Sequence, residues 1–347
     1  MAVQVSLADI RKVSDGILQA IGVSEGHRRI IVESIVYAHG RGKGTHGIGR
    51  LPIYVEKIDN GLMNAHTPID VVRDHRASAI LSANHGFGQV ASIEAVDLAV
   101  RKASRYGIAS VAVRASNNFG TVGFVCEHAA KQGMVALVFS NASPAIAPSG
   151  GEKPILGTNP LGIAFPKSKS GMMISLDMAT SATARGKIRQ AAKDETLIPY
   201  GWALDEDGHP TNDPGKALKG SMLALGGHKG YGLSLCIDIL AGLLSGAGFA
   251  GRVLPLSSKA GYSDYGHLII VMDVSFYLGM DDFQKQIEYL ITEIKKTSSS
   301  NEVLVPGESN RGYTEGSKVD LSEKVAAEIN TLALRFNSAR FKYGSDT

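Results

Sequence analysis

Residues 44–52 read Gly44-Thr45-His46-Gly47-Ile48-Gly49-Arg50-Leu51-Pro52 and follow a helical pattern that ends near residue 39. If the chain re-enters a helix here with Thr45 as its N-cap, His46 and Arg50 lie on one face of that helix. An imidazole gives or takes a proton near neutral pH, and a guanidinium holds a carboxylate through two parallel hydrogen bonds. The stretch therefore predicts a site for a 2-oxo or 2-hydroxy acid, and the alternative is a helix cap with an exposed ion pair.

Composition narrows the class of protein. The 347 residues are enough for two domains with real cores, and 44% hydrophobic with 20% charged residues is ordinary for a soluble enzyme. The formal charge of +3 comes from 36 basic and 33 acidic residues spread along the chain, which predicts neither nucleic acid nor a membrane surface as a partner.

Cysteine usage and the N-terminal sequence predict a cytoplasmic protein. Cys126 and Cys236 both lie in apolar helical patterns, which indicates buried thiols in a reducing compartment and no disulfide. No apolar run approaches the ~18 residues of a membrane span. The first residues lack the basic and apolar regions of a signal peptide.

Helical and strand patterns alternate along the chain. Helices are expected over 7–18, 24–39, 51–60, 89–106, 126–132, 231–245, 280–296 and 321–336, and strands within 69–82 and over 108–114, 134–140, 161–166, 172–177 and 267–273. The polar residues 185–220 predict an ordered excursion, and residues 297–301 are the best linker candidate. This order predicts an α/β fold with a mixed or largely parallel sheet covered by helices.

The segment Gly86-Phe87-Gly88-Gln89-Val90-Ala91 has the spelling of a Rossmann dinucleotide-binding turn and opens a helix. Arg114, at the end of the next strand, is placed as if to meet a 2′-phosphate. Residues 77–85, however, make a poor buried parallel strand, so a glycine-rich helix entry is the favoured interpretation.

Three further positions have chemistry that suits a ligand. His228 and Lys229 lie in a glycine-rich loop before an apolar helix, where an anion can bind, although a solvated lysine is the alternative. Thr158 follows Gly157 in a loop that either orients a polar ligand or forms a structural turn. Asp177 ends a strand, where it either binds a ribose, orients His46 or caps a helix.

Metal and hydrolase chemistry lack their motifs. Neither H-E-x-x-H nor C-x-x-C occurs, and the histidines do not have metal-ligand spacing, so no metal site is predicted. The absence of G-x-S-x-G argues against an α/β-hydrolase.

Together these motifs resemble the malate/L-lactate dehydrogenase type 2 family, also called the sulfolactate dehydrogenase-like oxidoreductases. The matching runs occur in the family's order over roughly residues 5 to 336: Thr45-His-Gly-Ile-Gly-Arg-Leu-Pro, Ser116-Asn-Asn-Phe-Gly, Gly157-Thr-Asn-Pro-Leu-Gly-Ile-Ala-Phe-Pro, Asp177-Met-Ala-Thr-Ser, Gly227-His-Lys-Gly-Tyr-Gly-Leu and Pro306-Gly-Glu.

The resemblance implies a fold, an assembly and a cofactor. The family's NAD(P)-binding fold is not a Rossmann fold, and the N- and C-terminal segments form one domain around a central cofactor domain. Applied here, residues 1–116 begin the substrate and dimerisation domain, 117–296 form the NAD(P)-binding domain and 297–347 return to the first domain. A homodimer using NAD or NADP follows, and the sequence does not distinguish the two coenzymes.

The resemblance also assigns residues. His46 is the proton donor to the carbonyl oxygen in the reductive direction, and Arg50 and Thr158 hold the substrate acid. With Thr45 and Asn118 these residues form the expected substrate site, and Asp177 is counted with His46 because its position at a strand end allows it to orient the imidazole. The family's cofactor-contacting segments match Asn118, Phe119, Gly120, Thr121 and Val122; Leu176, Asp177 and Met178; His228 and Lys229; and Pro306, Gly307 and Glu308.

The chain departs from the family's usual residues at several positions. Thr45 stands where serine is usual and keeps the hydroxyl. Asn118 stands where histidine is usual, and an amide forms hydrogen bonds but cannot shuttle a proton. Ser149 and Ala224 replace an aromatic residue and a proline in two glycine-rich loops. These changes bear on which acid is the substrate.

The expected reaction transfers a hydride between NAD(P)H and C2 of a small 2-oxo or 2-hydroxy acid such as malate or lactate. Two alternatives stay open. One is a reductase of cyclic 2-imino acids, in which Arg50 again holds the carboxylate. The other is a catalytically silent homologue that binds the dinucleotide as a sensor.

Overall fold

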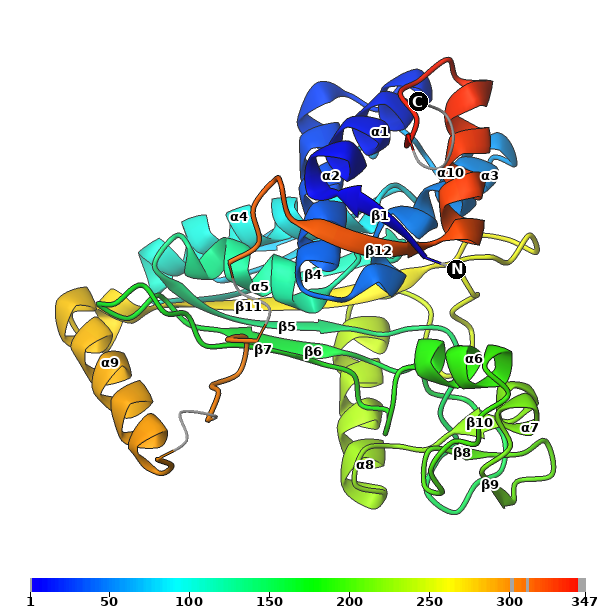
Figure 1. Ribbon diagram of the computed structural model, residues 1–347. Helices are drawn as coiled ribbons and strands as arrows, with labels where there is room; N and C mark the ends of the chain where they lie inside the picture. The colour runs from blue at the N-terminus through cyan, green and yellow to red at the C-terminus, as the bar shows by residue number, and fades with distance from the viewer. Residues whose placement is uncertain (1, 300–302, 310–311, 343–347) are drawn as a thin grey trace.

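A seven-stranded sheet forms the centre of the computed structural model, which describes residues 2–299, 303–309 and 312–342 (Figure 1). Its strand order is β2-β3-β4-β11-β5-β6-β7. Only β3 and β4 are parallel among the described strands, and the other neighbours are antiparallel. The strands are β2 (Asp70–His75), β3 (Ser78–Ser82), β4 (Ile108–Ser116), β5 (Met134–Ser140), β6 (Leu161–Ala164), β7 (Ser175–Met178) and β11 (Tyr265–Asp273).

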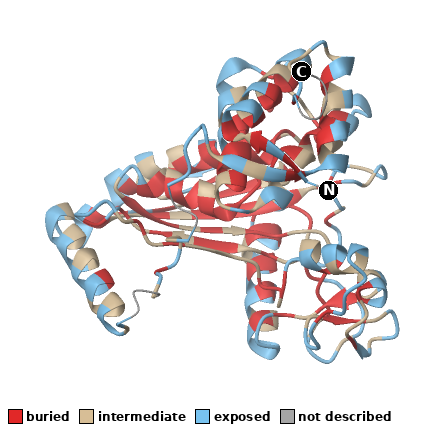
Figure 2. Cartoon of the chain, in the orientation of Figure 1, coloured by how far each residue is buried: buried red, intermediate tan, exposed pale blue. Residues whose placement is uncertain are grey.

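Helices cover the sheet. On one face, α4 (Gly88–Tyr106) and α5 (Val122–Ala130) pack on the strands through buried small residues (Figures 1 and 2). In α4 an alanine occupies every fourth position along the buried face, and these small side chains let the helix lie close to the sheet. The residues are Ala91, Ala95, Ala99 and Ala103. On the other face, α8 (His228–Ile237) continues as a π-helical segment, Asp238–Leu243, and packs on β11 and β5. The amphipathic α9 (Met280–Lys296) lies at the far end of the sheet from the termini (Figure 1).

The two ends of the chain form one packed unit. Strand β1 (Ala2–Ser6) pairs antiparallel with β12 (Lys318–Ser322), and Ser6 and Asp9 form a capping box that starts α1 (Leu7–Ala20). The remaining helices of the unit are α2 (Glu25–Gly40), α3 (Leu51–Asp59) and α10 (Glu323–Arg335). The apolar faces of these helices share one core.

Residue 116 is the last residue of β4, so residues 1–116 and 117–296 both supply strands to the same sheet. The expected division into domains stays a prediction.

Residues 181–224 form a small lobe beside the sheet. It contains residues 185–220, for which the sequence predicted an ordered excursion. Its three-stranded sheet and two helices pack around a second core that contains Ile188 and Met222, and residues 145, 146 and 156 from outside the lobe contribute to it. The elements are α6 (Arg185–Lys193), β8 (Ala203–Leu204), β9 (Pro210–Thr211), α7 (Pro214–Lys219) and β10 (Ser221–Met222). Helix α6 lies on the side of the lobe that faces the terminal unit (Figure 1).

The sheet is mixed, which is one of the two forms expected from the sequence, and other details differ. Strand β3 lies within the predicted strand region 69–82, but it pairs parallel with β4 although residues 77–85 were judged a poor buried parallel strand. Cys126 is buried, whereas Cys236 is exposed on α8, and both are free. The last predicted helix, 321–336, is confirmed as α10, which begins only at Glu323 because residues 321 and 322 end strand β12. Part of the linker candidate, residues 300 and 301, lies outside the described residues.

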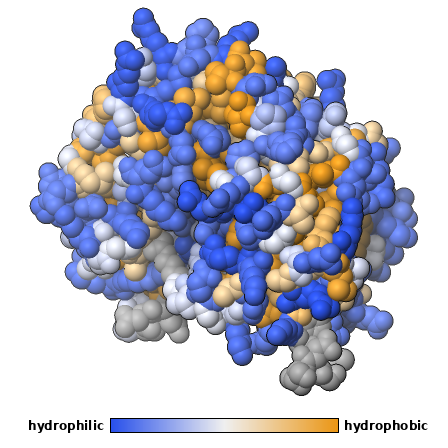
Figure 3. Space-filling model, turned by 90° about the horizontal axis from the view of Figure 1, so that it is seen from above, coloured by the Kyte–Doolittle hydropathy of each residue, from blue (hydrophilic) through white to orange (hydrophobic). Residues whose placement is uncertain are grey.

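No helix in the described part of the chain combines the length and apolar character that crossing a membrane requires. The face of the molecule seen in Figure 3 is largely hydrophilic, with apolar residues gathered in separate patches.

The Gly86–Ala91 segment is a glycine-rich helix entry, as favoured from the sequence. Gly88 is the first residue of α4, and a Cβ there would lie 2.1 Å from the carbonyl oxygen of Asn117. Glycine is therefore required because the helix start meets the backbone that leaves β4.

We expect Gly88→Ala to lower the free energy of unfolding by about 1–3 kcal/mol, because the added methyl must displace backbone. Urea denaturation measures the loss. Gly26→Ala is the matched control on α2, since nothing lies within 4 Å of its Cβ position. That substitution should be neutral or stabilising, because alanine favours a helix. Equal stability of the two variants would show that the crowding at Gly88 is unimportant.

Candidate functional site

A cavity of about 420 Å³ opens beside β7, the edge strand of the large sheet. Five segments from the terminal unit, the sheet layer and the small lobe meet around it. We call it the His46 pocket, and its lining is Gly42, Lys43, Gly44, Thr45, His46, Gly120, Thr121, Val122, Thr158, Pro160, Asp177, Ala179, Ala184, Gly186, Lys187 and Gln190.

The turn that carries His46 is not the helix expected from the sequence. Residues Gly44–His46 and Ile48–Arg50 form two short 3₁₀ turns, and α3 begins only at Leu51. Thr45 therefore lies inside the first turn and is not an N-cap. The two turns break at Gly47, whose extended ψ of −149° interrupts the helical path.

His46 and Arg50 remain neighbours in spite of this break. Nε of Arg50 donates to the carbonyl oxygen of Thr45 at 2.8 Å. Burial, then the charges of Arg50 and Lys43, lower the pKa of His46 to about 3. His46 is thus a neutral imidazole at neutral pH. Its Nδ1 is enclosed and has no hydrogen-bond partner among the described residues.

Asp177 contacts a lysine and a helix start. Its Oδ2 lies 2.6 Å from Nζ of Lys43 and accepts the backbone N–H of Gly123, in the first turn of α5, at 3.1 Å. A Cβ at Gly123 would come within 2.8 Å of the carboxylate. The hydrogen bonds described for Asp177 thus match the helix-cap interpretation, and none of them goes to His46.

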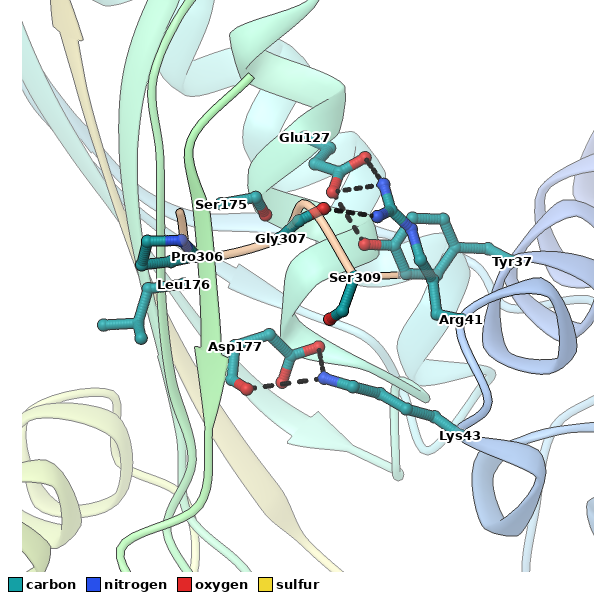
Figure 4. Close-up of a pocket in the computed structure, with 10 residues that line it drawn as sticks. All are labelled: Tyr37, Arg41, Lys43, Glu127, Ser175, Leu176, Asp177, Pro306, Gly307 and Ser309. Atoms are coloured by element: carbon teal, nitrogen blue, oxygen red, sulfur yellow. Dashed lines mark hydrogen bonds and ion pairs between the residues drawn. The ribbon is translucent and has the colours of Figure 1, made fainter. Parts of the chain in front are cut away.

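A second cavity, of about 250 Å³, continues along β7 (Figure 4). We call it the Gly307 pocket. It shares Lys43 and Asp177 with the His46 pocket, so the two cavities adjoin at this ion pair. The lining residues are Tyr37, Arg41, Lys43, Glu127, Ser175, Leu176, Asp177, Pro306, Gly307 and Ser309.

A buried ion pair forms one wall of the Gly307 pocket. The guanidinium of Arg41 donates to both carboxylate oxygens of Glu127, at 3.0 and 3.2 Å, and to the carbonyl oxygen of Gly307 at 2.8 Å. The hydroxyl of Tyr37 donates to the same carboxylate at 2.8 Å. Figure 4 shows these side chains on one side of the cavity and the Lys43–Asp177 pair on another.

The structure brings together many of the residues that the resemblance assigned. Thr45, His46, Gly120, Thr121, Val122, Thr158 and Asp177 line the His46 pocket, and Leu176, Asp177, Pro306 and Gly307 line the Gly307 pocket.

Other assigned residues lie outside both linings, among them Arg50 and the buried Phe119. Oδ1 of Asn118 accepts the N–H of Gly120 at 3.0 Å, and Met178 is half-buried. Glu308 pairs with Lys295. His228 and Lys229 are exposed at the start of α8.

Sequence reasoning missed Lys43, the Arg41–Glu127 pair and the residues of α6. The signals available were the two basic residues just upstream of the quoted stretch and the basic run at positions 185, 187, 189 and 193. Nothing local indicated that α6 would lie over the pocket, where the Cβ position of Gly186 is 3.1 Å from the methyl of Thr45.

The sequence also matches a known family over most of its length. A family model described as malate/L-lactate dehydrogenase matches residues 5–330. The chain belongs to the malate/L-lactate dehydrogenase family. It is therefore an oxidoreductase by family, and the mixed α/β fold is the one that its structural neighbours share.

Three similar proteins illustrate the range of activities after which members of the family are named. L-sulfolactate dehydrogenase of Methanothermobacter thermautotrophicus is 40% identical, with 93% of this chain and 94% of the relative covered. The solved sulfolactate dehydrogenase of Methanocaldococcus jannaschii has a TM-score of 0.89 at 34% identity, with 97% and 98% covered. Δ1-Piperideine-2-carboxylate reductase of Pseudomonas syringae has a TM-score of 0.85 at 29% identity, with 95% and 100% covered. Other relatives are named for NADP(+), in Chromohalobacter salexigens, and for NAD(+), in Escherichia coli.

His267 is a second buried imidazole that the sequence analysis did not single out. It packs against the segment 118–122, to which the resemblance assigned cofactor contacts. His267 on β11 lies between the hydroxyls of Ser140 and Ser116, with its nitrogens 2.9 and 2.8 Å from them. Its ring meets Phe119 edge to face at 4.6 Å. Burial lowers the pKa of His267 to about 3.

In the unfolded chain this histidine takes up a proton near pH 6.5, whereas in the folded chain it stays neutral. The free energy of unfolding therefore includes the full contribution of neutral His267 only above about pH 6.5. The contribution is lost as pH falls toward 3, at about 1.4 kcal/mol per pH unit. We expect His267→Gln to show a shallower fall in the free energy of unfolding between pH 6.5 and 4.5, measured by urea denaturation. His209→Gln, at a side chain that is 78% exposed, is the control and should keep the wild-type slope. Parallel slopes for all three proteins would contradict the expectation.

Proposed function

We propose that the chain is an NAD(P)-dependent dehydrogenase that moves a hydride between the nicotinamide and C2 of a small 2-hydroxy or 2-oxo acid. The observation that carries the proposal is an imidazole, His46, in a cavity that Thr45 and Thr158 also line. Arg50 lies outside that lining but is held next to it by its hydrogen bond to the carbonyl oxygen of Thr45. The names of the relatives, sulfolactate and malate dehydrogenases, support the same chemistry.

The cofactor would lie along β7, through both pockets. Two features suit a dinucleotide there. The hydroxyl of Thr121, a residue only 3% exposed, has no described partner and lies at the start of α5, where backbone N–H groups favour an anionic group. Gly307, with a positive φ of 83°, holds the chain against β7 at the other end. When bound, NAD(P) accepts or supplies the hydride.

The residues of this chain supply the proton and the orientation. In the oxidative direction, neutral His46 accepts the proton of the substrate hydroxyl, and in the reductive direction it returns a proton to the oxygen on C2. Arg50 fixes the C1 carboxylate. Its Nε is hydrogen-bonded to Thr45, and no hydrogen bond is described for its two terminal Nη groups, so these can donate to the carboxylate oxygens. The oxygen on C2 thereby faces the imidazole.

We expect His46→Ala to lower kcat by about 10²–10⁴-fold, because the proton relay is lost. The Kd for NADH, from fluorescence titration, should stay near that of the wild type. His75→Ala, at an exposed histidine of β2, is the control and should change neither value. An unchanged kcat in His46→Ala would remove this residue from the mechanism.

Charge in the His46 pocket favours acids with two anionic groups. Malate and sulfolactate, after which relatives are named, carry a second acid group beyond the C1 carboxylate. Lys43 is already neutralised by Asp177, whereas the ammonium of Lys187 has no acidic partner among the described residues. We propose that Lys187 attracts the second acid group.

We therefore expect Lys187→Met to raise KM for oxaloacetate about tenfold, which is roughly 1.4 kcal/mol of binding, and to change KM for pyruvate far less. Lys193→Met, at the last residue of the same helix and outside the pocket lining, is the control. Equal changes for both acids, or a raised KM for NAD(P)H alone, would assign Lys187 to another role.

A reductase of cyclic 2-imino acids is the second candidate, and the similarity to the piperideine carboxylate reductase favours it. The same carboxylate clamp would serve a C=N substrate. Oxidation of NADH and NADPH with pyruvate, oxaloacetate, pyrroline-2-carboxylate and piperideine-2-carboxylate separates the two. Dinucleotide binding without turnover of any acid would instead indicate the silent homologue. The homodimer, the coenzyme choice and the cytoplasmic location stay predictions.

A further inference from the structure

A third histidine lies directly behind the turn that carries His46. His39 is in the last turn of α2, and its residue exposure is only 6%. Its Nε2 accepts the backbone N–H of Ile48 at 3.0 Å. Ile48 is the first residue of the second 3₁₀ turn, which ends at Arg50.

The turn is shaped around this imidazole. A Cβ at Gly47 would lie 2.1 Å from Nε2 and 2.4 Å from Cδ2 of His39, so any other residue there would collide with the ring. A Cβ at Gly44 would lie 3.5 Å from the same ring. Two glycines of the G-T-H-G run thus face His39, with His46 between them in the sequence.

The hydrogen bond defines the state of the ring. Only an unprotonated nitrogen accepts an N–H, so His39 must be neutral with its proton on Nδ1. Burial lowers the pKa of His39 to about 4, which keeps the ring neutral at neutral pH. The bond is therefore present under the conditions in which the proposed reaction runs.

We propose that His39 is a positioning residue for the reaction, holding the junction of the two 3₁₀ turns so that His46 and Arg50 both face the bound acid. The inference rests on the proposed function. His39 itself is not assigned contact with the substrate, because it does not line the His46 pocket. It acts through the backbone N–H of Ile48, which lies between His46 and Arg50 in the chain.

The test compares two substitutions. In His39→Leu the acceptor is lost, and we expect kcat to fall about 10–100-fold with KM for the acid raised, while the Kd for NADH stays within about twofold. In His39→Gln a side-chain oxygen can again accept the N–H of Ile48, and kcat should recover to within about threefold of the wild type.

Val32→Ala is the control for general damage to α2. Val32 is buried on the same helix, away from the turn, so its truncation should lower stability while leaving kcat unchanged. All variants are assayed at temperatures where circular dichroism shows them folded.

A readout independent of activity is the imidazole NMR titration of His46, assigned with His46→Ala. In His39→Leu the pKa of His46 should rise toward its ordinary value as the turn opens, and in His39→Gln it should stay low. This titration tests the role of His39 even if the wild type turns over none of the acids. A lack of turnover would overturn the proposed function but not the positioning of His46 by His39.

Three results would overturn the inference. The first is a His46 titration that is the same in the wild type and in His39→Leu. The second is an equal loss of kcat in the leucine and glutamine variants. The third is a loss of NADH binding as large as the loss of kcat, since the damage would then extend to the whole site.

Discussion

The Arg41–Glu127 ion pair joins three distant parts of the chain, and the geometry of the site depends on it. The exposed fractions of the two side chains are 14% and 6%, so neither charge could stay in place without the other. Arg41 follows α2, Glu127 lies on α5, and the third partner is the carbonyl oxygen of Gly307 near the other end of the chain. The pair is therefore satisfied only when the terminal unit, the sheet layer and the 306–307 segment are assembled together.

This assembly sets where the turn that carries His46 begins. Two residues beyond Arg41, the ammonium of Lys43 reaches Asp177 on β7, and the turn with His46 follows at once. Asp177 in turn holds the first turn of α5, the helix that carries Glu127. The two ion pairs thus form a closed set of contacts around α2, α5 and β7. A shift of any one of these elements would separate a buried charge from its partner, which makes the pocket walls rigid at the point where the two cavities meet.

Local features were predictable from the sequence, and contacts between distant residues were not. Strand β5 and helix α9 have the bounds that period and end signals indicated, because both signals lie within the element. The antiparallel place of β11 was not predictable, since its strand pairing joins residues as far apart in the sequence as Met272 and Ile108. The expected cap at Thr45 failed for a related reason. The course of the turn follows the ring of His39, and no rule for helix starts contains that contact.

The charges around His46 describe a site that is completed by its substrate. Burial is the main cause that lowers the pKa of His46, and the charges of Arg50 and Lys43 lower it further. A carboxylate held by Arg50 would add a negative charge beside the ring and cancel part of that repulsion, which raises the pKa of His46. Proton uptake and binding of the acid would then favour each other, because each relieves an unfavourable charge left by the other. If the proposed function holds, a neutral histidine before binding and a protonated one beside a bound 2-oxo acid are two states of the same electrostatic balance, and the same turn would serve both directions of the proposed reaction.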